Sequence, residues 1–174
     1  MCFKFCPNCK TKLVHKIDRL IDCKNCGYVY YLAPALTNGA IIENKKGEIL
    51  LVKRKIPPKK GFWDVAGGFV DYQENLEQSL IREVKEELGV IITDLKYFTS
   101  QEDRYFFKGI NYYTLCAFFT GKVDEEKIIA VDDISGYKFF PKSEIPFDKL
   151  AFKGLKKVIR KYITVHQVRK VLSS

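Results

Sequence analysis

A glutamate-rich segment, residues 68–90, constrains this chain more than any other part of its sequence. Its apolar residues recur at helical spacing, and a glycine follows them where a left-handed helix cap is expected, so residues 75–88 are predicted to form an amphipathic helix. Glu83, Glu86 and Glu87 are three or four residues apart and therefore share one face of this helix. Carboxylates packed in this way repel one another unless a cation lies between them.

The chemistry of such a face suits a divalent metal. Mg²⁺ prefers oxygen ligands and often bridges carboxylates to substrate phosphates, where it polarises phosphoryl oxygens and orients an attacking water. A charge-assisted hydrogen bond between Arg82 and Glu74 is expected to hold the preceding loop against the helix. The Gly67-Gly68 turn allows the backbone to approach a metal or substrate closely. Taken alone, three glutamates more often form a solvated acidic face than a metal site, so the residues around them are needed to distinguish the two.

The whole segment resembles the signature of the Nudix hydrolase family, G-x5-E-x7-R-E-U-x-E-E-x-G-U, where U is a bulky aliphatic residue. All nine specified positions match: Gly68, Glu74, Arg82, Glu83, Val84, Glu86, Glu87, Gly89 and Val90. From average composition, chance agreement at a given start is on the order of one in a billion. The resemblance therefore overrides the solvated-face interpretation.

The resemblance implies an activity and a set of site residues. The family hydrolyses a pyrophosphate bond in a nucleoside diphosphate linked to another moiety, usually with Mg²⁺ or Mn²⁺. By position, the implied catalytic and metal-binding residues are Gly68, Glu74, Arg82, Glu83, Glu86 and Glu87. The three helical glutamates are implied as metal ligands, one of them also as a candidate base. Gly68 is implied as a carbonyl donor, with Glu74 and Arg82 as supporting residues.

Four cysteines fall in two CxxC pairs separated by 13 residues: Cys6, Cys9, Cys23 and Cys26. Four thiolates at this spacing can collect one tetrahedral ion, and zinc suits them because it demands no further geometry and has no redox chemistry. With every ligand supplied by protein, the site is expected to be structural. An iron site and four unrelated core cysteines are the alternatives. Cys2 is expected to be a free thiol, and Cys116 a core residue.

A zinc ribbon before such a domain resembles the NADH pyrophosphatase branch of the family. Tyr30-Tyr31 and Ala66-Gly67-Gly68 follow that branch, and Asp133 aligns with its acidic metal ligand before the last strand. After Gln101, however, residues 102–107 replace the Pro-Trp-Pro-Phe-Pro type segment of the branch, and no counterpart of its extra N-terminal domain is expected here. The reaction class therefore transfers by resemblance, whereas NADH preference does not.

The candidate substrate contacts lie in the replaced segment and among the aromatic residues. Acidic and basic side chains just after Gln101 are candidates for substrate recognition, and a plain surface loop is an equally good interpretation. Aromatic side chains can stack on a base, although packing is their more common role. The candidate substrate-binding residues are Phe62, Glu102 and Arg104, with Asp103, Tyr31 and Phe106 as further options.

The order of predicted elements indicates the fold class. Residues 1–33 are expected to form the zinc ribbon and residues 34–174 the Nudix domain. Strand patterns occupy residues 37–43, 48–55, 62–70, 95–100, 112–119 and 137–140, and a helix is expected over residues 149–171. The first two strands are predicted to form a hairpin. Strands on both sides of a central helix predict an α+β fold, a Nudix-type α/β/α sandwich with a mixed sheet, preceded by a small four-cysteine zinc ribbon.

Composition limits the partners and the compartment. The chain is 47% hydrophobic, which excludes a largely disordered protein, and no apolar run approaches the roughly 20 residues that span a bilayer. No membrane partner is therefore expected, and without a signal-peptide pattern the expected compartment is the cytoplasm. Thirty Lys and Arg against 21 Asp and Glu give a net charge of +9, which attracts polyanions without choosing among them.

Three functions are compared on this basis. The leading hypothesis is an enzyme acting on a small nucleotide such as ADP-ribose or NADH, because the carboxylates are intact. The second is a nucleotide-sensing or nucleic-acid-binding protein, suggested by the basic C-terminal residues Lys153, Lys156, Lys157, Arg160, Lys161, Arg169 and Lys170. Removal of nucleotide caps from RNA ranks below small-molecule hydrolysis. A homodimer is compatible with the resemblance, since family members often form dimers.

Overall fold

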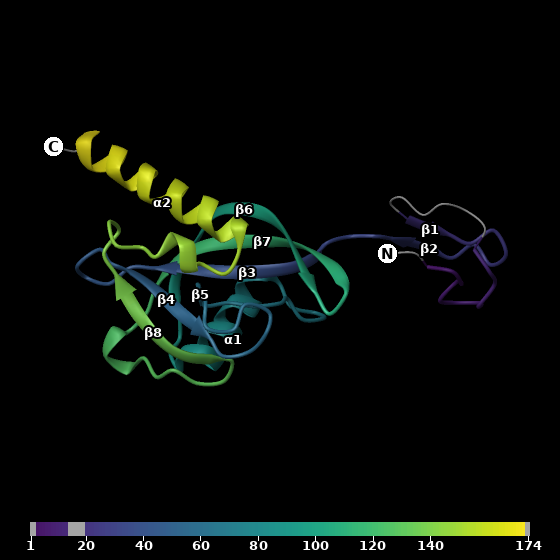
Figure 1. Ribbon diagram of the computed structural model, residues 1–174, viewed down its shortest axis with the longest axis horizontal. Helices are drawn as coiled ribbons and strands as arrows, with labels where there is room; N and C mark the ends of the chain where they lie inside the picture. Colours follow the sequence, from purple (N-terminus) through teal and green to yellow (C-terminus); the bar gives the residue numbers. More distant parts are fainter. Residues whose placement is uncertain (1–2, 14–19, 173–174) are drawn as a thin grey trace. The chain divides into compact units, whose positions relative to one another are not determined.

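The computed structural model describes residues 3–13 and 20–172, and the chain divides into two compact units, Met1–Pro34 and Ala35–Ser174 (Figure 1). Cys2 lies outside the described residues. Both α-helices of the described part of the chain belong to the second unit. Neither is long and apolar enough to span a membrane.

The first unit contains a two-stranded antiparallel sheet and two similar cysteine turns. Strands β1 (Leu20–Asp22) and β2 (Val29–Tyr31) pair from Leu20–Tyr31 to Asp22–Val29. In each turn, the N–H of the residue four positions after the first cysteine donates to that cysteine's carbonyl, over 2.9 Å from Lys10 to Cys6 and 2.8 Å from Gly27 to Cys23. Lys10 and Gly27 both have a φ in the left-handed region, 63° and 70°. The two CxxC turns therefore share one local geometry.

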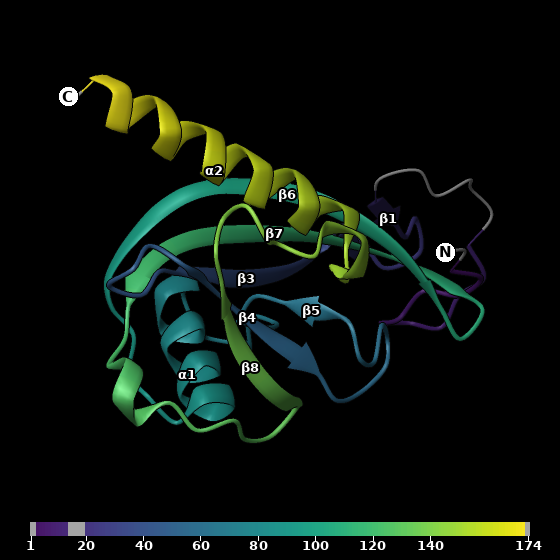
Figure 2. The same ribbon diagram turned by 60° about the vertical axis from the view of Figure 1, so that its left-hand side comes forward.

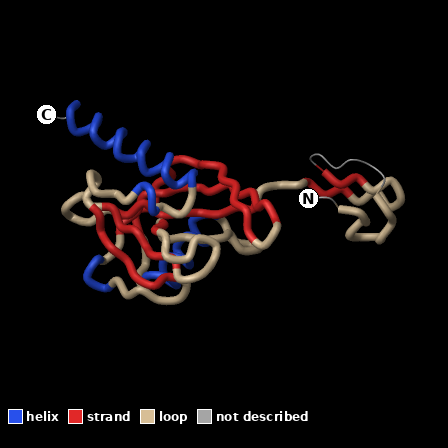
Figure 3. Tube along the Cα trace, in the orientation of Figure 1, coloured by secondary structure: helices blue, strands red, loops and turns tan. Residues whose placement is uncertain are grey.

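The second unit is built from two three-stranded sheets and two α-helices (Figure 3). Its elements are β3 (Ala35–Ile42), β4 (Ile49–Arg54), β5 (Trp63–Asp64), α1 (Leu76–Leu88), β6 (Thr93–Phe107), β7 (Ile110–Lys122), the 3₁₀ turn η1 (Glu125–Lys127), β8 (Ile134–Phe140), the 3₁₀ turn η2 (Phe147–Lys149) and α2 (Lys153–Leu172). One sheet has the order β3-β7-β6, with β3 parallel and β6 antiparallel to β7. The other has the order β5-β4-β8 and is antiparallel. The predicted mixed sheet is confirmed.

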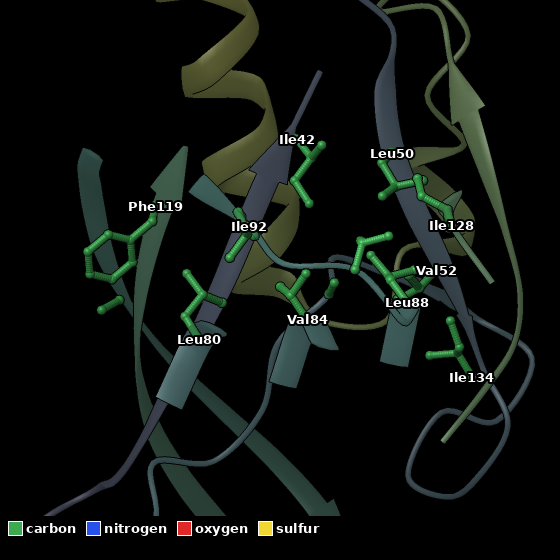
Figure 4. Close-up of a cluster of buried hydrophobic side chains, with 14 residues drawn as sticks. Ile42, Leu50, Val52, Leu80, Val84, Leu88, Ile92, Phe119, Ile128 and Ile134 are labelled. Atoms are coloured by element: carbon green, nitrogen blue, oxygen red, sulfur yellow. The ribbon is translucent and has the colours of Figure 1, made fainter. Parts of the chain in front are cut away.

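Alternating side chains of the central strands divide the apolar core into two layers. Ala40 and Ile42 of β3 pack in a cluster with the apolar face of α1, and Ile41 between them packs in a second cluster with α2. Strands β4 and β7 alternate in the same way, because successive side chains of a strand point to opposite faces. Figure 4 shows the α1-side cluster, and Figure 2 shows the two helices on opposite sides of the strands. The predicted α/β/α sandwich is confirmed.

The predicted hairpin of the first two long strands is wrong in its pairing. The turn forms, with Gly47 N–H donating to the Asn44 carbonyl over 2.9 Å, but only the bridge between Glu43 and Ile49 joins the two strands. Beyond it, β3 and β4 enter different sheets. The free edge of β3 is taken by residues 66–70, which exchange backbone hydrogen bonds with residues 36–40. Because these bonds satisfy β3, no edge remains for β4.

The segment after Gln101 is a strand and not a loop. Strand β6 continues to Phe107 and turns into β7 at Ile110, so both strands are longer than predicted. Half-buried and exposed residues alternate from Gln101 to Phe107, and the rings of Tyr105 and Tyr112 stack across the strands at 5.3 Å. Alternating burial and aromatic cross-strand pairs both favour strand structure. Side chains of this extended hairpin also line a pocket of the second unit.

Candidate functional site

Local signals set the position and the ends of helix α1. Asn75 caps its first turn, accepting from the N–H of Gln78 over 2.8 Å, while the Gln78 side chain accepts from the Asn75 N–H over 3.1 Å. This reciprocal pair is a capping box. At the other end Gly89 adopts φ 68° and donates its N–H to the Lys85 carbonyl. The glutamate face of the helix therefore has a defined start, length and rotation.

Arg82 joins the loop before α1 to the glutamates on it. Its guanidinium donates to both carboxylate oxygens of Glu74, at 2.8 and 3.0 Å, and to the Phe69 carbonyl at 3.1 Å. Nη1 donates to Glu83 at 3.0 Å and to Glu86 at 2.9 Å. The hydrogen bond from Arg82 lowers the pKa of Glu74. One half-buried cation thus orients three carboxylates.

Glu87 is the most deeply buried acid of the helix, with 8% of its surface exposed. One carboxylate oxygen accepts the N–H of Gly67 over 3.0 Å. Burial raises the pKa of Glu87 to about 8, and the Gly67 hydrogen bond offsets this only in part. Burial also raises the pKa of Glu83, against the opposing effect of Arg82. Two adjacent carboxylates therefore lie where negative charge is costly without a cation.

Gly67 and Gly68 bring the backbone of residues 66–70 directly against this acidic face. A Cβ on Gly68 would lie 2.5 Å from the carboxylate of Glu83, and a Cβ on Gly67 would overlap the Asn38 backbone. Gly67 also has φ 140°, which disfavours any other residue. The Gly68 carbonyl, expected from the sequence to face a metal, accepts the Asn38 N–H over 2.9 Å, which leaves it a second lone pair.

The donor set fits a divalent cation by its chemistry. Glu83, Glu86 and Glu87 provide hard anionic oxygens, and the missing Gly68 side chain leaves a cradle beside Glu83. Their oxygens are not gathered as tightly as the cysteine sulfurs, since Arg82 lies between Glu83 and Glu86. Asp133, aligned with a metal ligand by resemblance, is exposed just before β8, where its backbone carbonyl accepts the Lys55 N–H over 2.8 Å.

A pocket of about 140 Å³ shares the two glycines with the acidic helix face. Its walls come from β3, from the β4–β5 loop, from the β6–β7 hairpin and from the start of α2. The lining residues are Thr37, Asn38, Arg54, Pro58, Asp64, Val65, Gly67, Gly68, Phe69, Asp103, Tyr105, Thr114, Cys116, Phe118, Phe152 and Leu155. The pocket therefore combines aromatic and apolar walls with a few charged groups, and Gly67 and Gly68 in its wall also contact Glu87 and Glu83.

The charged pair Arg54–Asp64 lines this pocket and was not predicted from the sequence. Arg54 Nη1 donates to Asp64 at 2.9 Å, and Arg54 Nε donates to the Pro58 carbonyl at 2.9 Å. The guanidinium lies 5.3 Å from the centre of the Phe152 ring. Burial raises the pKa of Asp64 in spite of Arg54. The sequence did contain a signal for this pair: Arg54 ends β4 and Asp64 ends β5, and each follows apolar residues. The two strands are neighbours in the sheet, which brings these ends together.

The predicted substrate contacts do not line the pocket. Glu102 is exposed, 3.8 Å from Lys157, and Arg104 is exposed with its Nε donating to Asn111 over 3.2 Å. Strand alternation explains this placement, because the pocket side of β6 carries Asp103 and Tyr105 instead. Phe62 is half-buried, with the Lys59 ammonium 5.3 Å from its ring centre. Of the further options in the second unit, Asp103 lines the pocket and Phe106 is 69% exposed, while Tyr31 belongs to the first unit and is 70% exposed.

The four cysteines of the first unit form a metal-binding geometry. The Sγ atoms of Cys6, Cys9, Cys23 and Cys26 all lie within 4.8 Å of one another, and the described cysteines form no disulfide. Hydrogen bonds between Cys9 and the neighbouring Thr11 and Asn25 lower the pKa of Cys9 to about 5, which favours the thiolate. Cys116, by contrast, packs against the α2-side cluster as expected for a core residue and also forms part of the pocket wall.

Comparison with known proteins agrees with this geometry. The NUDIX domain family model matches residues 34–162. An NAD-capped RNA hydrolase NudC of Haemophilus influenzae is 40% identical over 102 residues, 56% of this chain and 38% of that protein. An ADP-ribose pyrophosphatase of Methanocaldococcus jannaschii is 36% identical over 150 residues, 85% of this chain and 83% of that protein. A NUDIX hydrolase from Nitrosomonas europaea superposes with TM-score 0.69 and 25% identity, covering 93% of this chain and 91% of that one.

The chain belongs to the NUDIX family. It matches the family over its second unit, where the capped helix, the two glycines and the pocket lie. The chain covers less than half the length of the NudC relatives that it matches.

Proposed function

We propose that this protein hydrolyses a pyrophosphate bond in a nucleoside diphosphate linked to another moiety, with Mg²⁺ or Mn²⁺. The observation that carries the proposal is the pair Gly67-Gly68, which borders both the acidic face of α1 and the pocket. A nucleotide in that pocket has its phosphates next to Glu83 and Glu87. The geometry supports a small-molecule substrate bound beside a charged reaction centre.

Each residue of the acidic face has a distinct part in this proposal. Glu83, Glu86 and Glu87 would hold the divalent cations, which would polarise phosphoryl oxygens and lower the pKa of water. Arg82 orients Glu83 and Glu86 and ties them to the loop through Glu74. The Gly67 N–H orients the Glu87 carboxylate. These contacts hold the carboxylates in place, so the residues that would bind the cation are already oriented.

ADP-ribose is the first substrate to test. The relative from Methanocaldococcus jannaschii is named an ADP-ribose pyrophosphatase, and the match covers most of this chain and most of that protein. The pocket offers the rings of Tyr105 and Phe152 for a base and the fixed guanidinium of Arg54 for a phosphate. Asp133 is proposed as a further metal ligand, by resemblance. In the first unit, we assign the four-cysteine cluster to a structural zinc ion, because four converging sulfurs leave no open position for water.

The test is a product assay on ADP-ribose, NADH, NAD, a dinucleoside polyphosphate and NAD-capped RNA with Mg²⁺. Glu86→Gln is expected to lower turnover at least about a hundredfold, because it removes an anionic ligand worth several kcal/mol in the transition state. Glu77→Gln is the matched control, an exposed acid in the first turn of the same helix and outside the Arg82 network. Full turnover in Glu86→Gln would refute the assigned site.

NAD-capped RNA is the second candidate substrate. NudC of Haemophilus influenzae carries that activity in its name, although this chain covers only 38% of it. The observation that favours RNA here is a row of basic side chains on α2, which begins at the pocket. If folded, zinc-loaded protein turns over none of the five substrates, a nucleotide-sensing role replaces the enzymatic one.

A further inference from the structure

Helix α2 carries an unbalanced positive charge. Its sequence, Lys153–Leu172, contains no Asp or Glu. The basic residues whose side chains are described are Lys153, Lys156, Lys157, Arg160 and Lys161. At 3.6 residues per turn these five positions fall within roughly 140° of the helix circumference. We call them the α2 basic stripe.

The opposite side of the helix is anchored in the core. Leu155, Val158, Ile159 and Tyr162 are at most 3% exposed and belong to the α2-side cluster. The stripe therefore lies on the side of the helix opposite the buried apolar residues and keeps a fixed orientation. The apolar residues of this part of α2 are used in the core, so the stripe has no apolar anchor of the kind that enters a lipid surface.

The stripe begins at the rim of the nucleotide pocket. Phe152 and Leu155, which precede and open α2, line the pocket. Asp103 of β6 accepts the Gly154 N–H over 2.6 Å, and a Cβ on Gly154 would lie 2.8 Å from the same carboxylate. This contact fixes the start of the helix against the pocket wall. From Lys153 to Lys161 the stripe then extends roughly 12 Å away from it.

The charge of the stripe is only weakly neutralised by its neighbours. Within the described part of the chain, one ion pair reaches it, between Lys157 and Glu102, and that pair is 3.8 Å long with both side chains largely exposed. Lys161 donates to the Thr99 hydroxyl at 2.8 Å, and the Arg160 guanidinium lies 4.9 Å from the Phe147 ring centre. Exposed pairs of this kind contribute little. The stripe is therefore available to a polyanion.

We propose that the α2 basic stripe binds the phosphate backbone of an RNA strand whose 5′-terminal nucleotide occupies the pocket. A polyphosphate chain complements a row of cations without an apolar component, and it connects directly to a nucleotide in the pocket. The inference rests on the proposed function for the terminal nucleotide, but the charge of the stripe is independent of it. In this arrangement the chain binds a capped RNA at two places, the terminal nucleotide in the pocket and the phosphate backbone on the α2 basic stripe.

The experiment measures the anisotropy of a 3′-fluorescein single-stranded RNA with a 5′-NAD cap at a series of salt concentrations. The test variant replaces Lys153, Lys157 and Lys161 by Gln, which removes three charges along one side of the helix. The control replaces Lys45, Lys46 and Lys127 by Gln. These lysines are exposed in the turn before β4 and in η1, two segments joined by a hydrogen bond from Lys45 N–H to Glu125. Both variants lose the same net charge.

For single strands the salt slope changes by about 0.7 per phosphate contact, so the stripe variant is expected to lower the slope by about two. Its affinity at low salt is expected to fall more than tenfold, while the control keeps the wild-type slope. Equal losses in both variants, or no RNA binding by the wild type, would overturn the proposal. Binding to phosphatidylserine vesicles without binding to RNA would assign the stripe to a membrane surface and overturn it too.

Turnover of the five substrates named above by the wild-type protein, measured in parallel, separates this inference from the proposed function. RNA binding that depends on the stripe, without turnover, supports the stripe and refutes the hydrolase. Turnover with RNA binding that is insensitive to the stripe supports the hydrolase and refutes the stripe.

Discussion

The two units of this chain differ in what they bury. Among the described residues of the first unit, three hydrophobic side chains are buried, and two of these, Cys6 and Cys23, belong to the cysteine cluster. The second unit buries two apolar layers, with α1 over one and α2 over the other. Apolar burial contributes about 25 cal/mol per Å² in either unit, so the first has very little of this term available. We therefore expect the fold of the first unit to depend on the proposed zinc ion, whereas the second can depend on its core.

The same contrast separates the two sets of candidate ligands. The cysteine sulfurs converge without help from any larger scaffold, in two turns of the same geometry. The glutamates of α1 are held by a long-range arrangement, with Gly67 donating to Glu87 and with Arg82 between the other two. A structural metal site can therefore be local, while a reaction centre here requires the packed fold. Four predictions test this contrast.

Removal of the metal is expected to have the largest effect. Chelation, or Cys23→Ser, should unfold residues 1–34 and leave residues 35–172 folded, since zinc supplies about 10–16 kcal/mol in small domains of this kind. Amide spectra by NMR would show the loss in one set of resonances alone. Cys116→Ser is the control and should keep one equivalent of zinc. Unfolding of both units together would contradict the separate dependence of the first unit on the metal.

A core truncation should have the converse effect. Leu80→Ala removes a fully buried side chain of the α1-side cluster and is expected to lower the free energy of unfolding of the second unit by about 2–5 kcal/mol. Zinc content should not change. Ile81→Ala, at the 36% exposed neighbouring position, should cost much less in the same denaturant titration. A similar cost at both positions would contradict the assigned face of the helix.

Gly68→Ala tests the close approach at the acidic face. The added methyl would overlap the Glu83 carboxylate, so we expect turnover to fall about tenfold to a hundredfold, the range seen when groups that orient metal ligands are lost. Gly109→Ala, at the β6–β7 turn, has open space around it but a φ of 80°, so it is the control for the destabilisation caused by a glycine substitution away from the acidic face. A drop in stability without any change in turnover would assign Gly68 to the fold alone.

The smallest effect is expected at the helix cap. Asn75→Ala removes the acceptor for the Gln78 N–H and should destabilise the second unit by about 1 kcal/mol, measured by thermal unfolding. Asn75→Asp keeps an acceptor and should be close to neutral. Because the cap also sets where the glutamate face begins, a larger fall in turnover than in stability would show that the reaction centre depends on the start of α1.

Much of the candidate site could be predicted from local signals. Helix α1 was predicted from its apolar spacing and its Gly89 end, and it was found with Asn75 as the cap. The expected contact between Arg82 and Glu74 is present as a bidentate pair. These features depend on residues within about two turns of one another. The pairing of β3 was not predictable in the same way, because its partners, β7 and residues 66–70, are chosen by competition among distant strands.

The residues that line the pocket could not be predicted from local sequence patterns either. Glu102 and Arg104 were selected from the sequence because they stand in the segment that departs from the related branch, but the strand places Asp103 and Tyr105 on the pocket side. Whether odd or even residues of β6 face the pocket depends on its register with β7, which no local pattern specifies. Arg54 and Asp64 meet for the same reason, through the pairing of β4 with β5.

The sequence by itself determined the family, the acidic helix and the cysteine cluster, because each is encoded by residue types at short, fixed spacings. Only the tertiary structure decided that Gly67-Gly68 runs along β3, that Glu87 is buried against it, and that α2 begins at the pocket. Those contacts join residues far apart in the chain. They form because hydrogen-bonding edges and apolar faces have to be satisfied over the whole molecule at once.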